Sequence, residues 1–177
     1  MTELWQALAQ GVLIGSTYGL LALGMGLVYG VSGVVNFSHG DFISLGMFMC
    51  LALFSAFSLD PYVSAIITIP VMTAIGAVVY RFLIRPMVGH QFLMVVQLTL
   101  GLSLVLQNGI LMVFGGQPAR TPSVVESKLL IVGDVVLRVP HVIAFAVSFV
   151  LAGGLYVMLR STDFGRSIRA VHQNAHA

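Results

Sequence analysis

The pattern of charged and uncharged positions divides the chain into long apolar segments joined by short polar connections. No Asp, Glu, Lys or Arg lies between Leu4 and Gly40, a stretch longer than the roughly 20 residues with which an α-helix crosses a bilayer. Later charge-free stretches are each long enough for a helical span, or close to it. We therefore predict an all-α, polytopic membrane protein forming a single transmembrane domain over 1–177, with spans at about 7–31, 42–59, 61–80, 92–114 and 141–159.

A polar run at 32–41 interrupts the apolar pattern between the first two spans and brings together four side chains able to hydrogen-bond: Asn36, Ser38, His39 and Asp41. If this run is a surface connection, water satisfies it. If it is a broken helix inside the membrane, helix ends can point at a solute, as they do in transporters. His39 and Asp41 alone do not form a metal-coordination set, and the run holds no paired nucleophile. We expect no metal, no cofactor and no catalytic site.

Glycines recur along one face of the first span, within roughly one 100° arc of a single helix. Small residues at this spacing let helices approach closely in lipid, where no hydrophobic force drives association. Packing against neighbouring helices explains the face fully, and sliding or rotation during a change of state is the functional alternative. The predicted packing positions are Gly11, Gly15, Gly19, Gly26 and Gly30.

The fourth span carries polar side chains on two faces. Gln97, Gly101 and Asn108 share one face, and Thr99, Ser103 and Gln107 share roughly the other. Such groups either bond neighbouring helices or line a route for a polar solute, and interhelical bonding is the simpler interpretation. As a hypothesis, a translocation path is lined by Asn36, Ser38, His39, Gln97, Thr99 and Asn108.

Composition agrees with a membrane protein and gives it an orientation. Hydrophobic residues make up 58% of the chain and charged residues 8%, with a mean hydropathy of +1.01, too little polar surface for a water-soluble globule. The net charge of +2 comes from basic residues in short connections, without a tract that could bind nucleic acid. Basic residues concentrate on the cytoplasmic side of membrane proteins. We therefore predict that the connection with Arg81 and Arg85 and the arginine-containing tail are cytoplasmic, and that the loop at 115–140 is external. Within that loop, the apolar stretches around Gly133-Asp134 suggest a short hairpin.

The tail, 160–177, has the pattern of a short amphipathic helix. Phe164 and Ile168 recur at helical spacing opposite Arg166 and Arg169, after the capping side chains of 161–163. Lipid headgroups could hold such a helix at the cytoplasmic surface, and a soluble partner could dock on it.

Three segments give the chain its resemblance to a known family: GSTYGLLALG at 15–24, GVVNFSHGD at 33–41 followed by Leu45-Gly46, and TDFGRSIRAV at 162–171. Together they resemble the inner-membrane permease subunits of bacterial high-affinity branched-chain amino acid ABC transporters, the LivH type. The resemblance covers nearly the whole chain, and the Asn-Phe-Ser-His-Gly-Asp segment is its most specific part.

The resemblance implies a non-enzymatic permease that works in a bacterial inner membrane with a second homologous permease, two ATP-binding subunits and an external substrate-binding protein. It implies that the cytoplasmic loop contacts the ATPase through Phe164, Gly165, Arg166, Ile168 and Arg169. Family members continue with further helices, so we expect this chain to be a truncated, N-terminal portion. Alternative hypotheses for the function are a urea or short-amide permease, a passive channel or ion-coupled carrier, and a non-transporting fragment.

Overall fold

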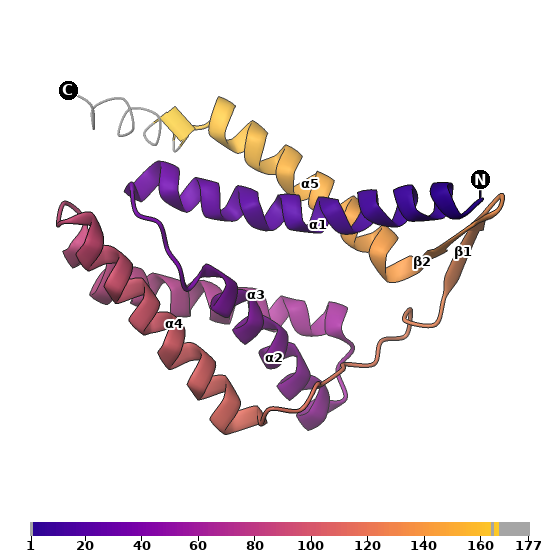
Figure 1. Cartoon of the computed structure of the whole chain (residues 1–177), viewed down its shortest axis with the longest axis horizontal. Helices are drawn as coiled ribbons and strands as arrows, with labels where there is room; N and C mark the ends of the chain where they lie inside the picture. The colour runs from indigo at the N-terminus through magenta and orange to yellow at the C-terminus, as the bar shows by residue number, and fades with distance from the viewer. Residues whose placement is uncertain (1, 164, 167–177) are drawn as a thin grey trace. The chain divides into compact units, whose positions relative to one another are not determined.

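The computed structural model describes residues 2–163 and 165–166. Within them lie five helices long and apolar enough to cross a membrane, so the prediction of an all-α polytopic protein with five spans is confirmed. Figure 1 shows them in chain order together with one hairpin: α1 (Thr2–Ser32), α2 (His39–Phe57), α3 (Pro61–Val79), α4 (Phe92–Phe114), β1 (Leu129–Val132), β2 (Val135–Arg138) and α5 (Val139–Ser161).

The chain divides into two compact units, one of residues 32–123 and the other of the residues before and after them. Each unit is described separately below. The assignment of one permease domain to 1–177 stays a prediction.

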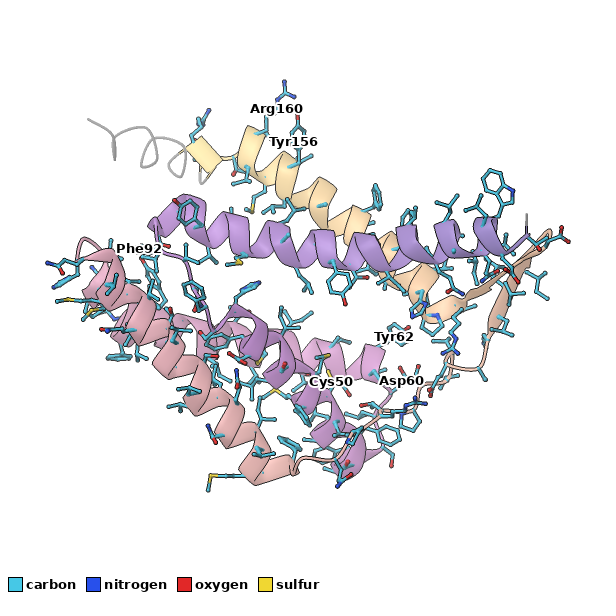
Figure 2. The ribbon with its side chains drawn as sticks, in the orientation of Figure 1. Cys50, Asp60, Tyr62, Phe92, Tyr156 and Arg160 are labelled. Atoms are coloured by element: carbon cyan, nitrogen blue, oxygen red, sulfur yellow. The ribbon has the colours of Figure 1, made fainter. Side chains whose placement is uncertain are left out.

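Helices α2, α3 and α4 make up the unit of residues 32–123, and small hydroxyl side chains occupy much of its interior. Without a hydrophobic force between helices in lipid, small residues permit close packing and hydroxyl groups can bond within or between helices. One such contact joins α2 to α3, where Cys50 Sγ lies 3.4 Å from Thr68 Oγ1 (Figure 2). The buried hydroxyl residues of this unit are Ser38, Ser64, Thr68, Thr99 and Ser103.

Asp60 fixes the start of α3. One carboxylate oxygen accepts from the backbone N–H of Tyr62 at 3.0 Å, which caps the helix, and Pro61 occupies the first helical position (Figure 2). The other oxygen accepts from Ser123 Oγ at 2.9 Å. One side chain therefore holds both the helix start and the loop that follows α4. At its far end α3 continues as a π-helical turn, Tyr80–Ile84, and a 3-10 turn, Arg85–Met87.

The other unit contains α1, the hairpin and α5. Strands β1 and β2 pair antiparallel, with Val132 opposite Val135, so Gly133 and Asp134 form a two-residue loop. Gly133 has a φ of +61°, which such loops require and glycine adopts without steric cost. The hairpin expected from the sequence is confirmed.

Candidate functional site

The connection between α1 and α2 satisfies its polar groups locally. Gly33 turns the chain with a φ of +65°. Asn36 Oδ1 then accepts two hydrogen bonds from Ser38, one from the backbone N–H at 3.1 Å and one from Oγ at 2.7 Å. Ser38 is fully buried, and its carbonyl accepts from the N–H groups of Asp41 and Phe42 at the start of α2. The start of α2 can therefore lie away from water without leaving the backbone N–H groups of Asp41 and Phe42 unpaired.

Contacts with α4 give the position of this connection along the membrane-spanning direction. Val34 packs with Val95, in the first turn of α4, and with Ile84. Asp41 contacts Ser103, the midpoint of α4, and further along the ring centroids of Phe48 and Phe114 lie 4.8 Å apart. At 1.5 Å per residue, Ser103 lies about 16 Å along α4 from its start, which is roughly half the hydrocarbon thickness. Helix α2 therefore begins near the middle of the span that α4 makes.

A hydrogen-bonded group of three side chains joins α2 to α4 at this level. Asp41 Oδ2 accepts from Ser103 Oγ at 2.5 Å, and Asp41 Oδ1 accepts from Gln107 Nε2 at 3.0 Å. Gln107 Nε2 also donates to Ser103 Oγ at 3.0 Å, which closes a triangle. Asp41 lies in the first turn of α2, where the positive end of the helix dipole favours an acidic side chain. We call Asp41, Ser103 and Gln107 the Asp41 cluster.

An open cavity of about 390 Å³ borders the Asp41 cluster. Its walls come from α2, the second half of α4 and the segment that follows α4. Phe48, Ile110 and Leu111 contribute apolar side chains to the lining, and Asp41 and Gln107 contribute polar ones. A cavity with both kinds of lining suits a small amphiphilic molecule.

The six residues of the hypothetical path occupy three different environments. Asn36 and Ser38 hold the connection before α2, and His39 is half-buried at the first position of that helix. Thr99 is fully buried, and its hydroxyl donates to carbonyls of its own helix, at 3.1 Å and 3.2 Å. Gln97 and Asn108 are exposed on α4, and Asn108 Nδ2 donates to the carbonyl of Leu104 at 2.7 Å. The structure thus does not gather the six around one cavity, and the path stays a prediction.

The members of the Asp41 cluster were absent from that predicted set, although the sequence carried a signal for each: Asp41 belongs to the polar run at 32–41, and Ser103 and Gln107 belong to a polar face of α4. Ser103 and Gln107 lie four residues apart, which places both on the face of α4 that Thr99 also shares. The sequence shows two polar faces on this helix and does not indicate which of them contacts another helix. Contact with Asp41 shows that the face of Ser103 and Gln107 meets α2.

The glycine face of α1 has no close neighbour among the described residues. At Gly11, Gly15, Gly19, Gly26 and Gly30, an added Cβ would meet no atom within 4 Å beyond the helix's own nearby backbone. Packing of another helix against this face stays a prediction.

Of the predicted coupling residues, Phe164, Ile168 and Arg169 lie outside the described residues. Gly165 and Arg166 follow α5 in a turn in which Thr162 Oγ1 accepts from the N–H of Gly165 at 3.1 Å. A Cβ at Gly165 would collide with the backbone of Leu159. Asp163 and Arg166 form an ion pair there.

Comparison with known proteins identifies the family. The model of the family described as "Branched-chain amino acid transport system / permease component" matches residues 7–177. The permease protein BraD of the high-affinity branched-chain amino acid transport system of Pseudomonas aeruginosa is 28% identical over 177 residues, 93% of this chain and 58% of BraD. The corresponding LivH of Escherichia coli K12 is 28% identical over 181 residues, again 93% and 58% of the two chains.

A probable LivH permease of Methanocaldococcus jannaschii is 30% identical over 166 residues, 88% of this chain and 50% of the relative. The chain thus spans little more than half the length of the curated relatives that it matches. No solved structure shows a significant match. With the family model covering nearly all of its residues and five helices suited to a bilayer, the chain belongs to the branched-chain amino acid transport system permease family.

Proposed function

We propose that this chain forms part of the membrane path of an ATP-driven importer for branched-chain amino acids. The match of the family model to residues 7–177 carries the proposal. The start of α2 near the middle of the span and the polar cluster beside it support a role in the path itself, because broken helices at this depth commonly mark solute sites in transporters.

The proposed partners are a second homologous permease, two ATP-binding subunits and an external substrate-binding protein, all in or at a bacterial inner membrane. ATP hydrolysis belongs to the partner subunits in this proposal. Residues 1–177 contain no Gly-x-x-x-x-Gly-Lys-Ser/Thr phosphate loop, which supports binding of the nucleotide by another chain.

The segment after α5 is the proposed contact with the ATPase. Its support is the amphipathic sequence pattern from Phe164 onward, with Arg166 and Arg169 opposite the apolar positions. Replacing Phe164 and Arg169 together by Ala should abolish co-purification of the ATPase while membrane insertion remains normal. Replacing Arg120 and Arg138, in the proposed external loop, is the control that should leave co-purification unchanged. Recovery of no nucleotide-binding partner with the unmodified chain would contradict the importer proposal.

Uptake of radiolabelled leucine tests the function directly. The chain is co-expressed with the proposed partner subunits in cells that lack their own branched-chain amino acid importers. We expect saturable leucine uptake that isoleucine and valine compete and urea does not, and that stops when ATP is depleted. Uptake that continues without ATP would instead favour a channel or an ion-coupled carrier. Competition by urea and short amides alone would favour the related permease class.

A further inference from the structure

Asp41 places a carboxylate near the middle of the span, where it accepts hydrogen bonds from two neutral donors, Ser103 and Gln107. Among residues 2–163 and 165–166, no Lys, Arg or His forms an ion pair with it. Charged side chains inside membranes are costly, and they pair with an opposite charge or serve a solute or ion pathway. A carboxylate has about four lone-pair positions, so the bonds from Ser103 and Gln107 leave room for further donors.

The walls beside Asp41 indicate which kind of cation would fit. Hard metal ions need several oxygen ligands, and the described residues contain no group of three or more His, Cys, Asp or Glu able to hold one. Phe48, Ile110 and Leu111 line the adjoining cavity with apolar surface. The combination of one carboxylate and an apolar wall matches an organic ammonium ion attached to a hydrocarbon group.

We propose that Asp41 binds the primary ammonium group of an amino acid whose apolar side chain lies against Phe48 and Ile110. Ser103 and Gln107 hold the carboxylate toward the cavity through their own hydrogen bonds. The inference rests on the proposed function, because it names the group that recognises the charged end of the transported solute. An ammonium ion donates three hydrogen bonds and supplies a positive charge, which none of the described residues places in an ion pair with Asp41.

Protection of a cysteine inside the cavity tests this inference. Ser44 lines the cavity, and its hydroxyl donates to the carbonyl of Gly40 on its own helix, at 3.2 Å, so Ser44→Cys in a Cys50→Ser background makes a mild reporter. Membrane vesicles containing the full-length chain are treated with a methanethiosulfonate reagent in the presence of leucine, 3-methylbutylamine or 4-methylpentanoate. The first two carry an ammonium group and the third carries only the carboxylate. We expect leucine and the amine to slow labelling, and 4-methylpentanoate to have no effect.

A second experiment removes the charge at residue 41 and keeps a side chain of nearly the same shape that can still form hydrogen bonds. Asp41→Asn should raise the leucine concentration needed for half-maximal protection about tenfold or more, since hydrogen bonds involving a charged group are stronger than neutral ones. Asp60→Asn is the matched control: it makes the same change at the start of α3, outside the cavity, and should leave protection unchanged.

The outcomes separate this inference from the proposed function. Protection by 4-methylpentanoate equal to that by leucine, or an unchanged protection curve in Asp41→Asn, would overturn the binding role of Asp41 even if leucine uptake is normal. Absence of leucine uptake by the assembled transporter, with protection by the amine retained, would overturn the importer proposal and leave the ammonium site standing. If Asp41→Asn fails to insert, the comparison of the amine with the acid in the Asp41 background still decides.

Discussion

Gln6 and Val136, 130 positions apart in the chain, are joined by two hydrogen bonds. The side-chain amide of Gln6 donates from Nε2 to the carbonyl of Val136 at 2.6 Å and accepts at Oε1 from its backbone N–H at 2.8 Å. One side chain near the start of α1 thereby satisfies both backbone groups of a residue in β2. This pair ties the hairpin to the first turns of α1.

Replacing Gln6 by Glu should loosen the hairpin. Glutamate still accepts from the N–H of Val136 but cannot donate to its carbonyl in the charged form, so one bond is lost and two acceptors face each other. We expect hydrogen exchange in Val135–Arg138 to accelerate roughly two- to tenfold, as loss of a bond contributing about 0.5–1.5 kcal/mol implies. Gln10→Glu, at an exposed position of the same helix, is the control and should leave exchange unchanged.

The hydrogen bond between Asp41 and Ser103 should be measurable as a coupling energy. In a double-mutant cycle with Asp41→Asn and Ser103→Ala, we expect coupling of about 0.5–2 kcal/mol in the free energy of unfolding, measured in micelles with increasing dodecyl sulfate. Ser64→Ala is the control partner because Ser64 is fully buried and its hydroxyl donates to the carbonyl of Leu59, at 3.4 Å, away from Asp41. A cycle of Asp41→Asn with Ser64→Ala should show no coupling. Equal values in the two cycles would contradict a direct interaction.

The position of the connection before α2 can be measured as a membrane depth. Phe37, Phe92 and Leu104 are exposed by 47%, 64% and 60%, so nitroxide labels on cysteines at these sites should be tolerated. Electron paramagnetic resonance with oxygen and a polar nickel complex reports the depth of each label. Because Val34 packs against the first turn of α4 and Asp41 bonds to its midpoint, the label at 37 should lie deeper than that at 92 and less deep than that at 104. A label at 37 as accessible to the nickel complex as one at 92 would place the connection at the membrane surface.

Asp60→Ala should destabilise the start of α3 by about 0.5–2 kcal/mol, the usual effect of losing an N-cap side chain. The loss removes both the bond to the N–H of Tyr62 and the bond from Ser123. Ser123→Ala leaves the capping bond to Tyr62 in place and should have a smaller effect, and Asp60→Ser should retain most of the capping. Unfolding in the same micelle titration gives the order of the three variants. Equal losses for Asp60→Ala and Asp60→Ser would show that capping contributes little here.

Local features of the structure were predictable because they depend on short-range patterns. Charge-free stretches of sufficient length predicted the five helices, since only apolar residues pass into hydrocarbon without cost. Gly133-Asp134 between two apolar stretches predicted the hairpin, because a two-residue loop needs backbone angles that glycine adopts freely. Residues 32–41 were predicted as a break because they interrupt the apolar pattern with groups that must find hydrogen-bond partners.

The depth of that break could not be read from the sequence, since water and neighbouring helices satisfy the same polar groups equally well. Contacts of Val34 and Asp41 with α4 place the break along that helix, and the depth follows from this placement as a prediction. The sequence also could not show which of the two polar faces of α4 packs against another helix. Lipid and protein interior are both apolar, so hydropathy does not tell a buried face from a lipid-facing one.

Length and hydropathy act on each segment independently, so they sufficed to predict a set of membrane helices with a polar interruption after the first. The contact of Asp41 with Ser103 and Gln107, residues 62 and 66 positions away, is visible only in the folded chain. That pairing depends on how α2 and α4 pack, which is set by complementary surfaces distant in the chain and not by any local pattern.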